Sequence, residues 1–377
     1  MTDTPDIKGH TAPGFEPVAD MFASLWDGTD EIGAAFAIEI GGERVVDLHA
    51  GWTSIKRETE WANNTLVPVF SASKPITAIT MGWLKDRGHF GFSDNVASYW
   101  PEFARNGKAD ISIAQALSYQ GGLCGLSEPG EATDWFDRQL IEAKLAAQAP
   151  LWTPGNGSGY HPITAGFIAD AIARRTDGRT IGQILKDEIA GPRGIDFFVG
   201  TPESEHARVA EHRLPSQPPH LGEINEFNTL AFLKPWSTPG RRGTTEWRKA
   251  EFPAANGHSN AAALATLMGV FANEGRLQGE TLLQPGTVGE LMTEQVARQD
   301  RVLPFDLSFG ISVIRNRTSG HFGPEPLAVG QYGMGGSCGF ADPERHISGS
   351  FTPNRLGRFL AGDPRAVSLI NAVYGCL

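Results

Sequence analysis

A serine and a lysine stand three residues apart at Ser71 and Lys74, directly after the apolar run 66–70. If a helix begins there, the two side chains share one face, with Cβ atoms about 5–6 Å apart. A serine hydroxyl is a weak nucleophile until a neighbouring base takes its proton, and a lysine is such a base only when its amine is neutral. Partial burial and the positive end of a helix both lower a lysine pKa. The spacing therefore predicts attack by Ser71 on a carbonyl carbon, with the main-chain N–H of Ser71 facing the oxyanion that forms.

Tyr160 is a second candidate, because the glycine-rich loop 152–162 delivers its hydroxyl just before a predicted helix. A tyrosine beside a lysine can hold or relay a proton as a phenolate, since the cation lowers the pKa of the phenol. The residues leave open which of Lys74 and Tyr160 is the base during acylation.

A third candidate segment, 329–343, runs from an apolar strand into several glycines. Glycine lets a substrate carbonyl approach the main chain closely, and an N–H at the strand edge would complete an oxyanion hole. The same segment also fits a glycine-rich hairpin between sheet strands, and the two interpretations are compatible.

Ser337 lies in a Gly-x-Ser-x-Gly pattern, which is typical of the nucleophile turn of α/β-hydrolases. That fold must still place an acid and then a histidine on later sheet elements, and Asp342 and His346 follow too closely to serve. This competing class of serine esterase is therefore the weaker hypothesis. Ser259 is a similar near miss, in a loop that feeds a helix, although its neighbour His258 could line the cleft.

A metal-dependent hydrolase would need histidines at ligand spacing. His206 and His212 each follow a glutamate, but the chain has no HExxH pattern and arginines alternate with these residues. The arrangement is typical of a solvated surface segment. We therefore predict no metal site.

Length, charge and cysteine content exclude several classes of protein. The chain has 377 residues, a net charge of −11 at pH 7 and three cysteines. Without any cluster of Lys and Arg, this charge gives no footprint for nucleic acid. No run reaches the ~20 apolar residues that cross a bilayer, and the cysteines are too few and too scattered for a disulfide framework. With no export signal visible in residues 1–15, we expect a cytoplasmic protein with neither a membrane nor a nucleic-acid partner.

Hydrophobic periodicity predicts strands and helices at both ends of the chain and helices between them. The expected strands are 33–39, 43–51, 307–314, 327–333 and 347–353. The expected helices are 17–26, 73–88, 113–117, 134–148, 163–175, 181–189, one capped by Asn260, and one that begins at Asp363-Pro364.

The length exceeds the usual span of one core, so this order predicts two lobes. Residues 1–65 and 255–377 would form an α/β sheet lobe, and residues 66–254 a helical lobe, with a cleft at the junction. Within the helical lobe, 214–256 is rich in Pro, Gly and polar residues and is long for a structureless connection. We expect this cover segment, 214–256, to lie over the site.

Ser71-x-x-Lys74, Tyr160 and Gln331-Tyr332-Gly333, in this order, resemble the three motifs of the serine β-lactamase and penicillin-binding protein superfamily. The stretches GGERVVDLHAGW, VFSASKPITA, LWTPGNGSGYH and GMGGSCGFADPE make the chain more similar to the β-lactamase-like, or family VIII, carboxylesterases. The resemblance covers nearly the whole chain. It implies an α/β (α+β) β-lactamase-like fold, with an antiparallel sheet flanked by terminal helices plus a helical lobe.

The resemblance also implies roles for individual residues. Ser71 would be the acylated nucleophile, and Lys74 with Tyr160 the base system. The substrate would lie along Gln331-Tyr332-Gly333, and the main-chain N–H of Met334 would join that of Ser71 in the oxyanion hole. No metal or organic cofactor is required. The predicted function is hydrolysis of small carboxylic esters, with two alternatives: an amide, lactam or D-amino-acid peptide hydrolase of the same fold, or a binding protein that is acylated without turnover.

Two departures from the motifs favour esters over penicillins. The third motif of penicillin-directed relatives begins with a lysine that binds a carboxylate, and Gln331 occupies that place here. The position two residues after the tyrosine is an asparagine in many β-lactamases, whereas this chain has Pro162, which offers no polar side-chain group.

Overall fold

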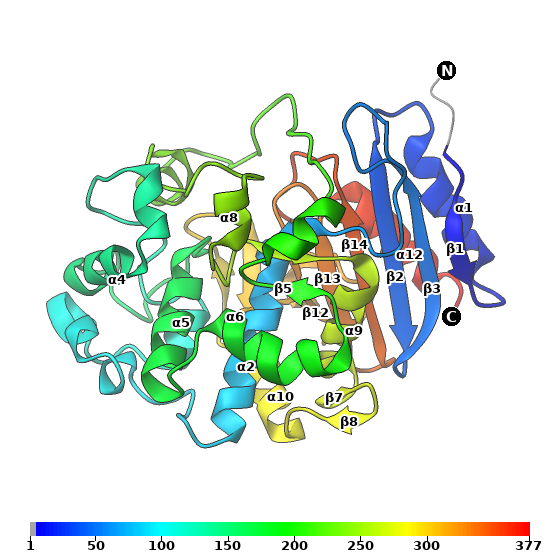
Figure 1. Ribbon diagram of the computed structural model, residues 1–377. Helices are drawn as coiled ribbons and strands as arrows, with labels where there is room; N and C mark the ends of the chain where they lie inside the picture. The colour runs from blue at the N-terminus through cyan, green and yellow to red at the C-terminus, as the bar shows by residue number, and fades with distance from the viewer. Residues whose placement is uncertain (1–4) are drawn as a thin grey trace.

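Strands from both ends of the chain pair in one antiparallel sheet, which occupies the right-hand half of Figure 1. The computed structural model describes residues 5–377, and within this range the sheet has nine strands. In spatial order they are β1 (Lys8–Thr11), β3 (Glu43–Gly51), β2 (Gly33–Ile40), β14 (Ile347–Pro353), β13 (Cys338–Asp342), β12 (Val329–Tyr332), β11 (Ile314–Arg315), β10 (Asp306–Phe309) and β9 (Val296–Gln299).

Helices from both ends of the chain cover this sheet. Terminal helices α1 and α12 pack together on one face, and α9 covers the other (Figure 1). The helices are α1 (Glu16–Ala23), α2 (Lys74–Asp86), α3 (Ile113–Leu117), α4 (Arg138–Ala147), α5 (Thr164–Thr176), α6 (Ile181–Ile184), α7 (Glu226–Asn228), α8 (Thr245–Lys249), α9 (Ala261–Ala272), α10 (Pro285–Met292), α11 (Asn316–Ser319) and α12 (Pro364–Tyr374). The expected fold class, α/β (α+β) with an antiparallel sheet, terminal helices and a helical part, is confirmed.

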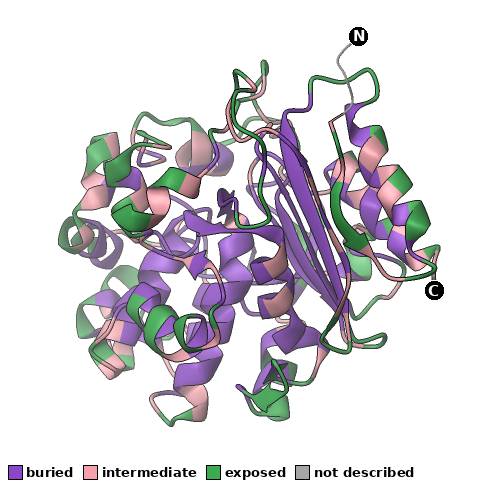
Figure 2. Ribbon diagram, turned by 45° about the vertical axis from the view of Figure 1, so that its right-hand side comes forward, coloured by how far each residue is buried: buried purple, intermediate pink, exposed green. Residues whose placement is uncertain are grey.

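The central strands β2, β12, β13 and β14 are buried along nearly their whole length because both faces of the sheet are covered. On β2, Phe36 and Ile38 pack with residues of α1 and α12, whereas Ala35 and Ala37 join the cluster that contains α9. Successive strand residues point to opposite faces, so a strand covered on both sides is buried at successive positions. Figure 2 shows the inner strands buried on both faces.

Predicted helix caps are present, and one predicted strand is divided. The side chain of Asn260 accepts a hydrogen bond from Ala263 N at 2.8 Å, and that of Asp363 accepts one from Arg365 N at 3.0 Å. The expected strand 307–314 is instead β10 and β11, because the chain turns back after Phe309 and the two short strands pair with each other. Strands β1 and β9 were not predicted, since their exposed sequences carry little apolar pattern.

A smaller sheet leads the chain to the candidate residues. It pairs β4 (Val67–Phe70) with β6 (Gly257–Ser259), and β6 with β5 (Phe197–Phe198). β4 runs directly into a short 3₁₀ turn, Ser71–Ser73, and then into α2. The cover segment contains only short helical pieces, among them α7 and α8, as expected. Separate domains with boundaries at 66 and 255 stay a prediction.

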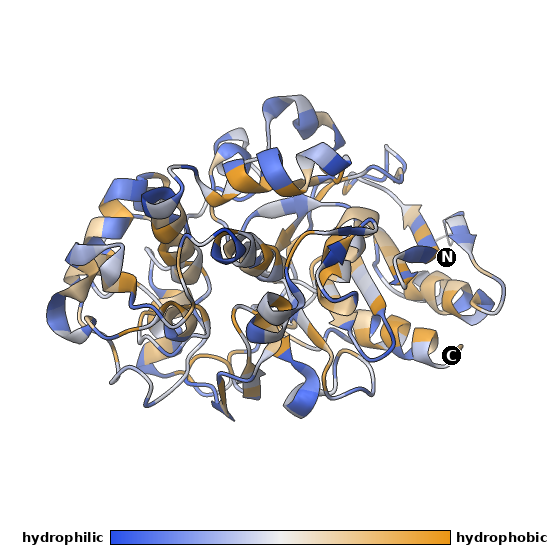
Figure 3. Ribbon diagram, turned by 90° about the horizontal axis from the view of Figure 1, so that it is seen from below, coloured by the Kyte–Doolittle hydropathy of each residue, from blue (hydrophilic) through white to orange (hydrophobic). Residues whose placement is uncertain are grey.

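No helix within residues 5–377 is both long enough and apolar enough to cross a membrane. Figure 3 shows hydrophilic residues interspersed with hydrophobic ones along the outer helices.

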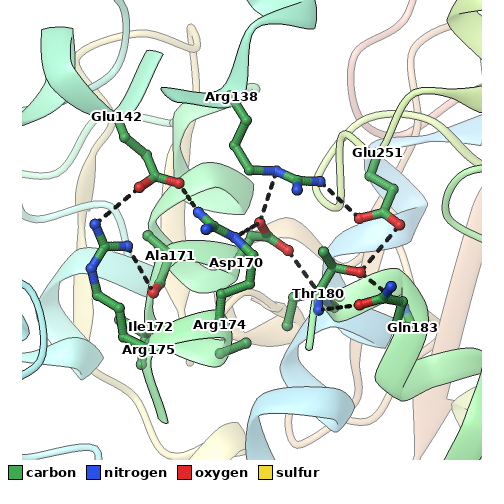
Figure 4. A network of polar contacts seen from close by, with 12 residues as sticks. Arg138, Glu142, Asp170, Ala171, Ile172, Arg174, Arg175, Thr180, Gln183 and Glu251 are labelled. Atoms are coloured by element: carbon green, nitrogen blue, oxygen red, sulfur yellow. Dashed lines mark hydrogen bonds and ion pairs between the residues drawn. The ribbon is translucent and has the colours of Figure 1, made fainter. Parts of the chain in front are cut away.

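An ion-pair network fastens the end of the cover segment to the helical part (Figure 4). Arg138 of α4 contacts Asp170 of α5 at 3.2 Å and Glu251 of the cover segment at 3.0 Å. Glu251 also accepts a hydrogen bond from Thr180 Oγ1 at 3.1 Å. Burial raises the pKa of Asp170 to about 6, and the nearby Arg138 opposes that rise. The network fixes the main chain just before Ala254, whose carbonyl oxygen contacts Lys74.

The close approach of β12 to β4 predicts that Gly333 tolerates no side chain. A Cβ atom built there would lie 2.1 Å from Val69 O and 2.2 Å from Ser337 Oγ. Gly333→Ala should therefore lower the free energy of unfolding by about 1–3 kcal/mol, as overpacking does. Urea denaturation measures this change.

The matched control is Gly289→Ala in α10, where a Cβ meets nothing within 4 Å. This control should stabilise the protein by about 0.5–1 kcal/mol, the usual gain for Ala over Gly in a helix. Equal stability of the two variants would contradict the packing described here.

Candidate active site

Ser71 follows a strained turn at the end of β4. The preceding residue, Phe70, has φ of +49° and ψ of −127°, a conformation that non-glycine residues rarely adopt and that costs on the order of 1–3 kcal/mol. Phe70 is held there by packing, with its ring 6.2 Å from the ring of Trp247. The turn starts a helix at Ser71, as the spacing predicted.

Lys74 lies behind Ser71 with 1% of its surface exposed. Its Nζ atom is 3.2 Å from Ser71 Oγ, 2.7 Å from the carbonyl oxygen of Pro162 and 2.8 Å from that of Ala254. Burial lowers the pKa of Lys74 well below its ordinary value of 10.5, and no carboxylate among the described residues offsets this shift. The structure therefore favours the neutral amine.

The two carbonyl groups also decide where the amine lone pair points. A neutral amine has two hydrogens and one lone pair, whereas a carbonyl oxygen only accepts. The oxygens of Pro162 and Ala254 take both hydrogens, so the lone pair is left for the hydroxyl hydrogen of Ser71. Lys74 is thus oriented as a proton acceptor.

The sequence analysis identified neither carbonyl group, because every residue has a main-chain oxygen and the residue type does not show which oxygen contacts Lys74. Pro162 replaces an expected polar side chain, yet its main chain supplies the contact that its side chain lacks. Ala254 is held in place by its neighbour, since Thr77 Oγ1 of α2 donates to Pro253 O at 2.8 Å. The network of Figure 4 anchors the same stretch through Glu251.

Tyr160 completes the group, but not as the expected phenolate. Lys74 Nζ lies 4.7 Å from the centre of its ring, and the phenol is 4% exposed. Burial raises the pKa of Tyr160 above its ordinary value, while a hydrogen bond with Ser71 works in the opposite direction. The expectation that the pKa of Tyr160 is lowered is wrong, because burial is the largest influence on this pKa and raises it. Tyr160 keeps its proton at neutral pH.

Asp300 positions Tyr160 through the main chain of that residue. No pattern in the sequence indicated Asp300. Its Oδ1 atom accepts hydrogen bonds from the main-chain N–H groups of Tyr160, Val302 and Leu303 at 3.0, 2.9 and 2.8 Å. Burial raises the pKa of Asp300 to about 6, and these donors limit the rise. His161, which follows Tyr160 in the chain, is fully buried, and its Nε2 atom accepts a hydrogen bond from Leu123 N at 3.0 Å.

Gln331 contacts Tyr160 but does not line the cavity over Ser71, whereas Tyr332 lines that cavity and has its polar contact elsewhere. Gln331 is 2% exposed, and its Nε2 atom lies 3.4 Å from Tyr160 Oη. The hydroxyl of Tyr332 donates to His321 O at 3.1 Å. Of these two neighbours on β12, Gln331 is therefore the one that contacts a candidate catalytic group.

The main chain after β12 offers Met334 N as a free donor. Gly333 N already donates to Ser337 O at 2.7 Å, so it is not available to a substrate. Met334 N makes no hydrogen bond with the described residues, and its side chain lines the same cavity as Ser71. This placement suits the predicted oxyanion donors, Ser71 N and Met334 N.

A cavity of about 290 Å³ opens onto Ser71 and Tyr160, and much of its wall is apolar. Lys74 does not line it and approaches Ser71 from the protein side. The cover segment supplies about half of the wall, as expected for a cover. The residues of the cover segment that line the cavity are Pro218, Pro219, Leu221, Phe232, Leu233, Thr238, Pro239, Arg242, Trp247, Phe252 and Ala255.

The competing candidates lie outside this cavity. Ser337 is buried and donates to Val69 O at 2.8 Å, which ties the β12–β13 hairpin to β4. His258 is buried against Trp247 and does not line the cavity. Within residues 5–377, no group of three or more His, Cys, Asp and Glu side chains could hold a metal ion.

Comparison with known proteins identifies the family of the chain. Residues 18–372 match the family model described as Beta-lactamase. The chain belongs to the beta-lactamase family. As a member of this family it is a hydrolase of the beta-lactamase fold.

Relatives within the beta-lactamase family include proteins described as esterases. The chain is 31% identical to "Esterase/beta-lactamase LipL" of Mycobacterium tuberculosis, over 94% of this chain and 85% of that protein. It superposes on a penicillin-binding protein homologue from Caulobacter crescentus with a TM-score of 0.96 and 44% identity, covering 99% and 100% of the two chains. A family VIII carboxylesterase gives a TM-score of 0.93 and 37% identity with the same coverage.

The lowered pKa of Lys74 predicts the pH dependence of kcat/KM. Below that pKa the amine carries a proton and cannot accept another, so kcat/KM should fall about tenfold per pH unit on the acid side. Above it the rate should stay level, because Tyr160 keeps its proton. With p-nitrophenyl butyrate as substrate, we expect the midpoint of this acid limb well below 10.5. A midpoint near 10 would contradict a neutral Lys74.

Asp300, whose pKa burial raises to about 6, could also produce an acid limb, so a variant must separate the two groups. Asp300→Asn should keep the acid limb, because the variant lacks the carboxylate but retains Lys74. Asp300→Ala leaves three N–H groups unpaired and should lower the free energy of unfolding by about 1–3 kcal/mol or more. Loss of the acid limb in Asp300→Asn would assign it to Asp300.

Proposed function

We propose that the chain is a serine carboxylesterase that cleaves small carboxylic esters through an acyl-enzyme on Ser71. The observation that carries this proposal is the buried Lys74 amine, whose hydrogens are taken by two carbonyl oxygens and whose lone pair faces Ser71 Oγ. The apolar cavity over Ser71 fits a small acyl or alkyl group. The description of one similar protein as a carboxylesterase, and of another as an esterase/beta-lactamase, supports the same reaction.

Acylation begins when Ser71 Oγ attacks the ester carbonyl carbon and Lys74 Nζ takes the hydroxyl proton. The carbonyl oxygen becomes an oxyanion, which the main-chain N–H groups of Ser71 and Met334 stabilise. As the tetrahedral intermediate collapses, the leaving alcohol receives a proton from Lys74, with Tyr160 as the relay. Lys74 is then neutral again, and Ser71 carries the acyl group.

Deacylation repeats these steps with water as the nucleophile. Lys74 takes a proton from the attacking water, a second oxyanion forms, and the bond between Ser71 Oγ and the acyl carbon breaks. The proton returns to Ser71, and the carboxylic acid leaves.

Gln331 favours esters over penicillins within this mechanism. Its amide carries no charge and lies 3.4 Å from Tyr160 Oη, so the position that holds a carboxylate-binding lysine in penicillin-directed relatives has no cation here. The cytoplasmic location and the lack of membrane and nucleic-acid partners stay predictions from the sequence.

Three variants test the mechanism. Ser71→Ala should lower kcat for p-nitrophenyl butyrate by at least about a thousandfold and should abolish labelling by a fluorophosphonate. Lys74→Ala and Tyr160→Phe should lose turnover to a similar degree, because members of one proton-transfer unit are not additive. Intact-mass spectrometry should show the acyl group on wild-type Ser71.

The matched control is Ser337→Ala, which removes the other serine in a nucleophile-like pattern. It should keep fluorophosphonate labelling, because Ser337 only ties the hairpin to β4. Labelling that depends on Ser337 and survives Ser71→Ala would overturn the assignment.

A comparison of kcat/KM for p-nitrophenyl butyrate, nitrocefin and a D-alanyl amide separates the substrate classes. We expect the ester to be the best substrate. Preference for nitrocefin or the amide would identify a lactam or amide hydrolase, and a burst without steady release would identify an acylated binding protein.

A further inference from the structure

The apolar cavity over Ser71 contains one charged side chain among its described lining residues, the guanidinium of Arg242. Arg242 lies in the cover segment, just before α8, and it is exposed to solvent at the cavity. The wall around it is built from residues such as Leu233, Pro239 and Trp247. A pocket that binds only an uncharged acyl group needs no cation in its wall, so the presence of Arg242 calls for a further role.

Arg242 has no counter-ion within the described chain. Its neighbour Arg241 pairs with Glu246 at 2.5 Å, whereas no described carboxylate pairs with Arg242. The hydrogen bond recorded for its side chain runs from Nη1 to the sulfur of Met334 at 3.3 Å. Thioether sulfur is a weak acceptor, and a guanidinium has five N–H donors, so most of its hydrogen-bonding capacity is free.

Arg242 also stands where two cavities meet. A second cavity of about 210 Å³ shares Arg242, Met334, Pro218 and Pro219 with the cavity over Ser71. Met334 supplies the proposed oxyanion N–H, so this junction lies beside the reacting carbonyl. An ester bound at this junction can place its acyl part in one cavity and its alcohol part in the other. The guanidinium of Arg242 borders both cavities, so it can contact either part of the ester.

We propose that Arg242 determines specificity by binding a carboxylate of the substrate, so that the preferred substrates are small esters that also carry a carboxylate. This inference rests on the proposed esterase function. The planar fork of a guanidinium matches a carboxylate with two parallel hydrogen bonds, and both are strengthened in an apolar wall. The net charge of −11 repels anions at long range, so the preference depends on this local contact.

The carboxylate can belong to either half of the ester. In a monomethyl ester of a dicarboxylic acid it lies on the acyl half. In an acetyl ester of a hydroxy acid it lies on the alcohol half. Monomethyl glutarate and 4-acetoxybutanoate represent these two sources.

The experiment compares each acid with its neutral primary amide, methyl glutaramate and 4-acetoxybutanamide, by chromatographic measurement of products. Wild-type protein should prefer at least one acid over its amide by about 10- to 100-fold in kcat/KM, the usual range for a charge-assisted hydrogen bond. A series of monomethyl esters from malonate to adipate should show a best chain length.

The variants are Arg242→Gln and Arg242→Lys, with Arg241→Gln as the matched control. Arg242→Gln should lose the preference for acid over amide, and Arg242→Lys should recover part of it, because lysine restores the charge without the fork. Arg241→Gln should keep the wild-type preference, since Arg241 is paired and does not line the cavity.

The outcomes separate this inference from the proposed function. Turnover of neutral esters without any preference for acids in wild type would overturn the role of Arg242 and leave the esterase intact. A preference that survives Arg242→Gln would also overturn it. If Arg242→Gln fails to fold, the comparison within wild type and Arg242→Lys still decides. Failure to hydrolyse any ester, with no acylation of Ser71, would reject the esterase itself.

Discussion

The proposed chemistry of this protein depends on keeping one amine, that of Lys74, uncharged. A lysine in water is protonated at neutral pH, and a protonated lysine cannot activate a serine. The chain solves this problem by burying Lys74 without a carboxylate partner and by giving its two hydrogens to carbonyl oxygens. An acidic partner would stabilise the charged form instead. The proposed mechanism therefore requires that Lys74 has no salt bridge.

The cover segment contributes to the site in three ways. It closes the cavity over Ser71, its end supplies the Ala254 carbonyl to Lys74, and its middle brings Arg242 to the cavity. An irregular segment can do this only if it is anchored, because loop backbone is otherwise mobile. Glu251 provides such an anchor through Arg138 and Thr180. Substrate preference can change by substitution in the middle of the cover segment while its anchored end preserves the base.

The grouping of side chains was predictable from the sequence, and the main-chain contacts were not. The structure brings Ser71, Lys74 and Tyr160 together, as their residue types and their local spacing on helix and loop predicted. Their roles in acyl transfer stay a prediction. The hairpin β2–β3 and the caps at Asn260 and Asp363 were predictable because their patterns are also local. The carbonyl contacts of Lys74 depend on tertiary packing, and the pKa of Tyr160 depends on burial, so neither leaves a local pattern. Asp300 acts only on backbone groups and was likewise invisible.

The two oxygens that hold Lys74 come from segments 88 and 180 residues away along the chain. No helix or hairpin can assemble this arrangement by itself. A partly folded chain would expose the lysine to water, where it gains a proton, and the serine would be as inert as any other surface alcohol. The proposed reactivity toward esters therefore requires the complete tertiary structure, and a nascent or damaged molecule would lack it.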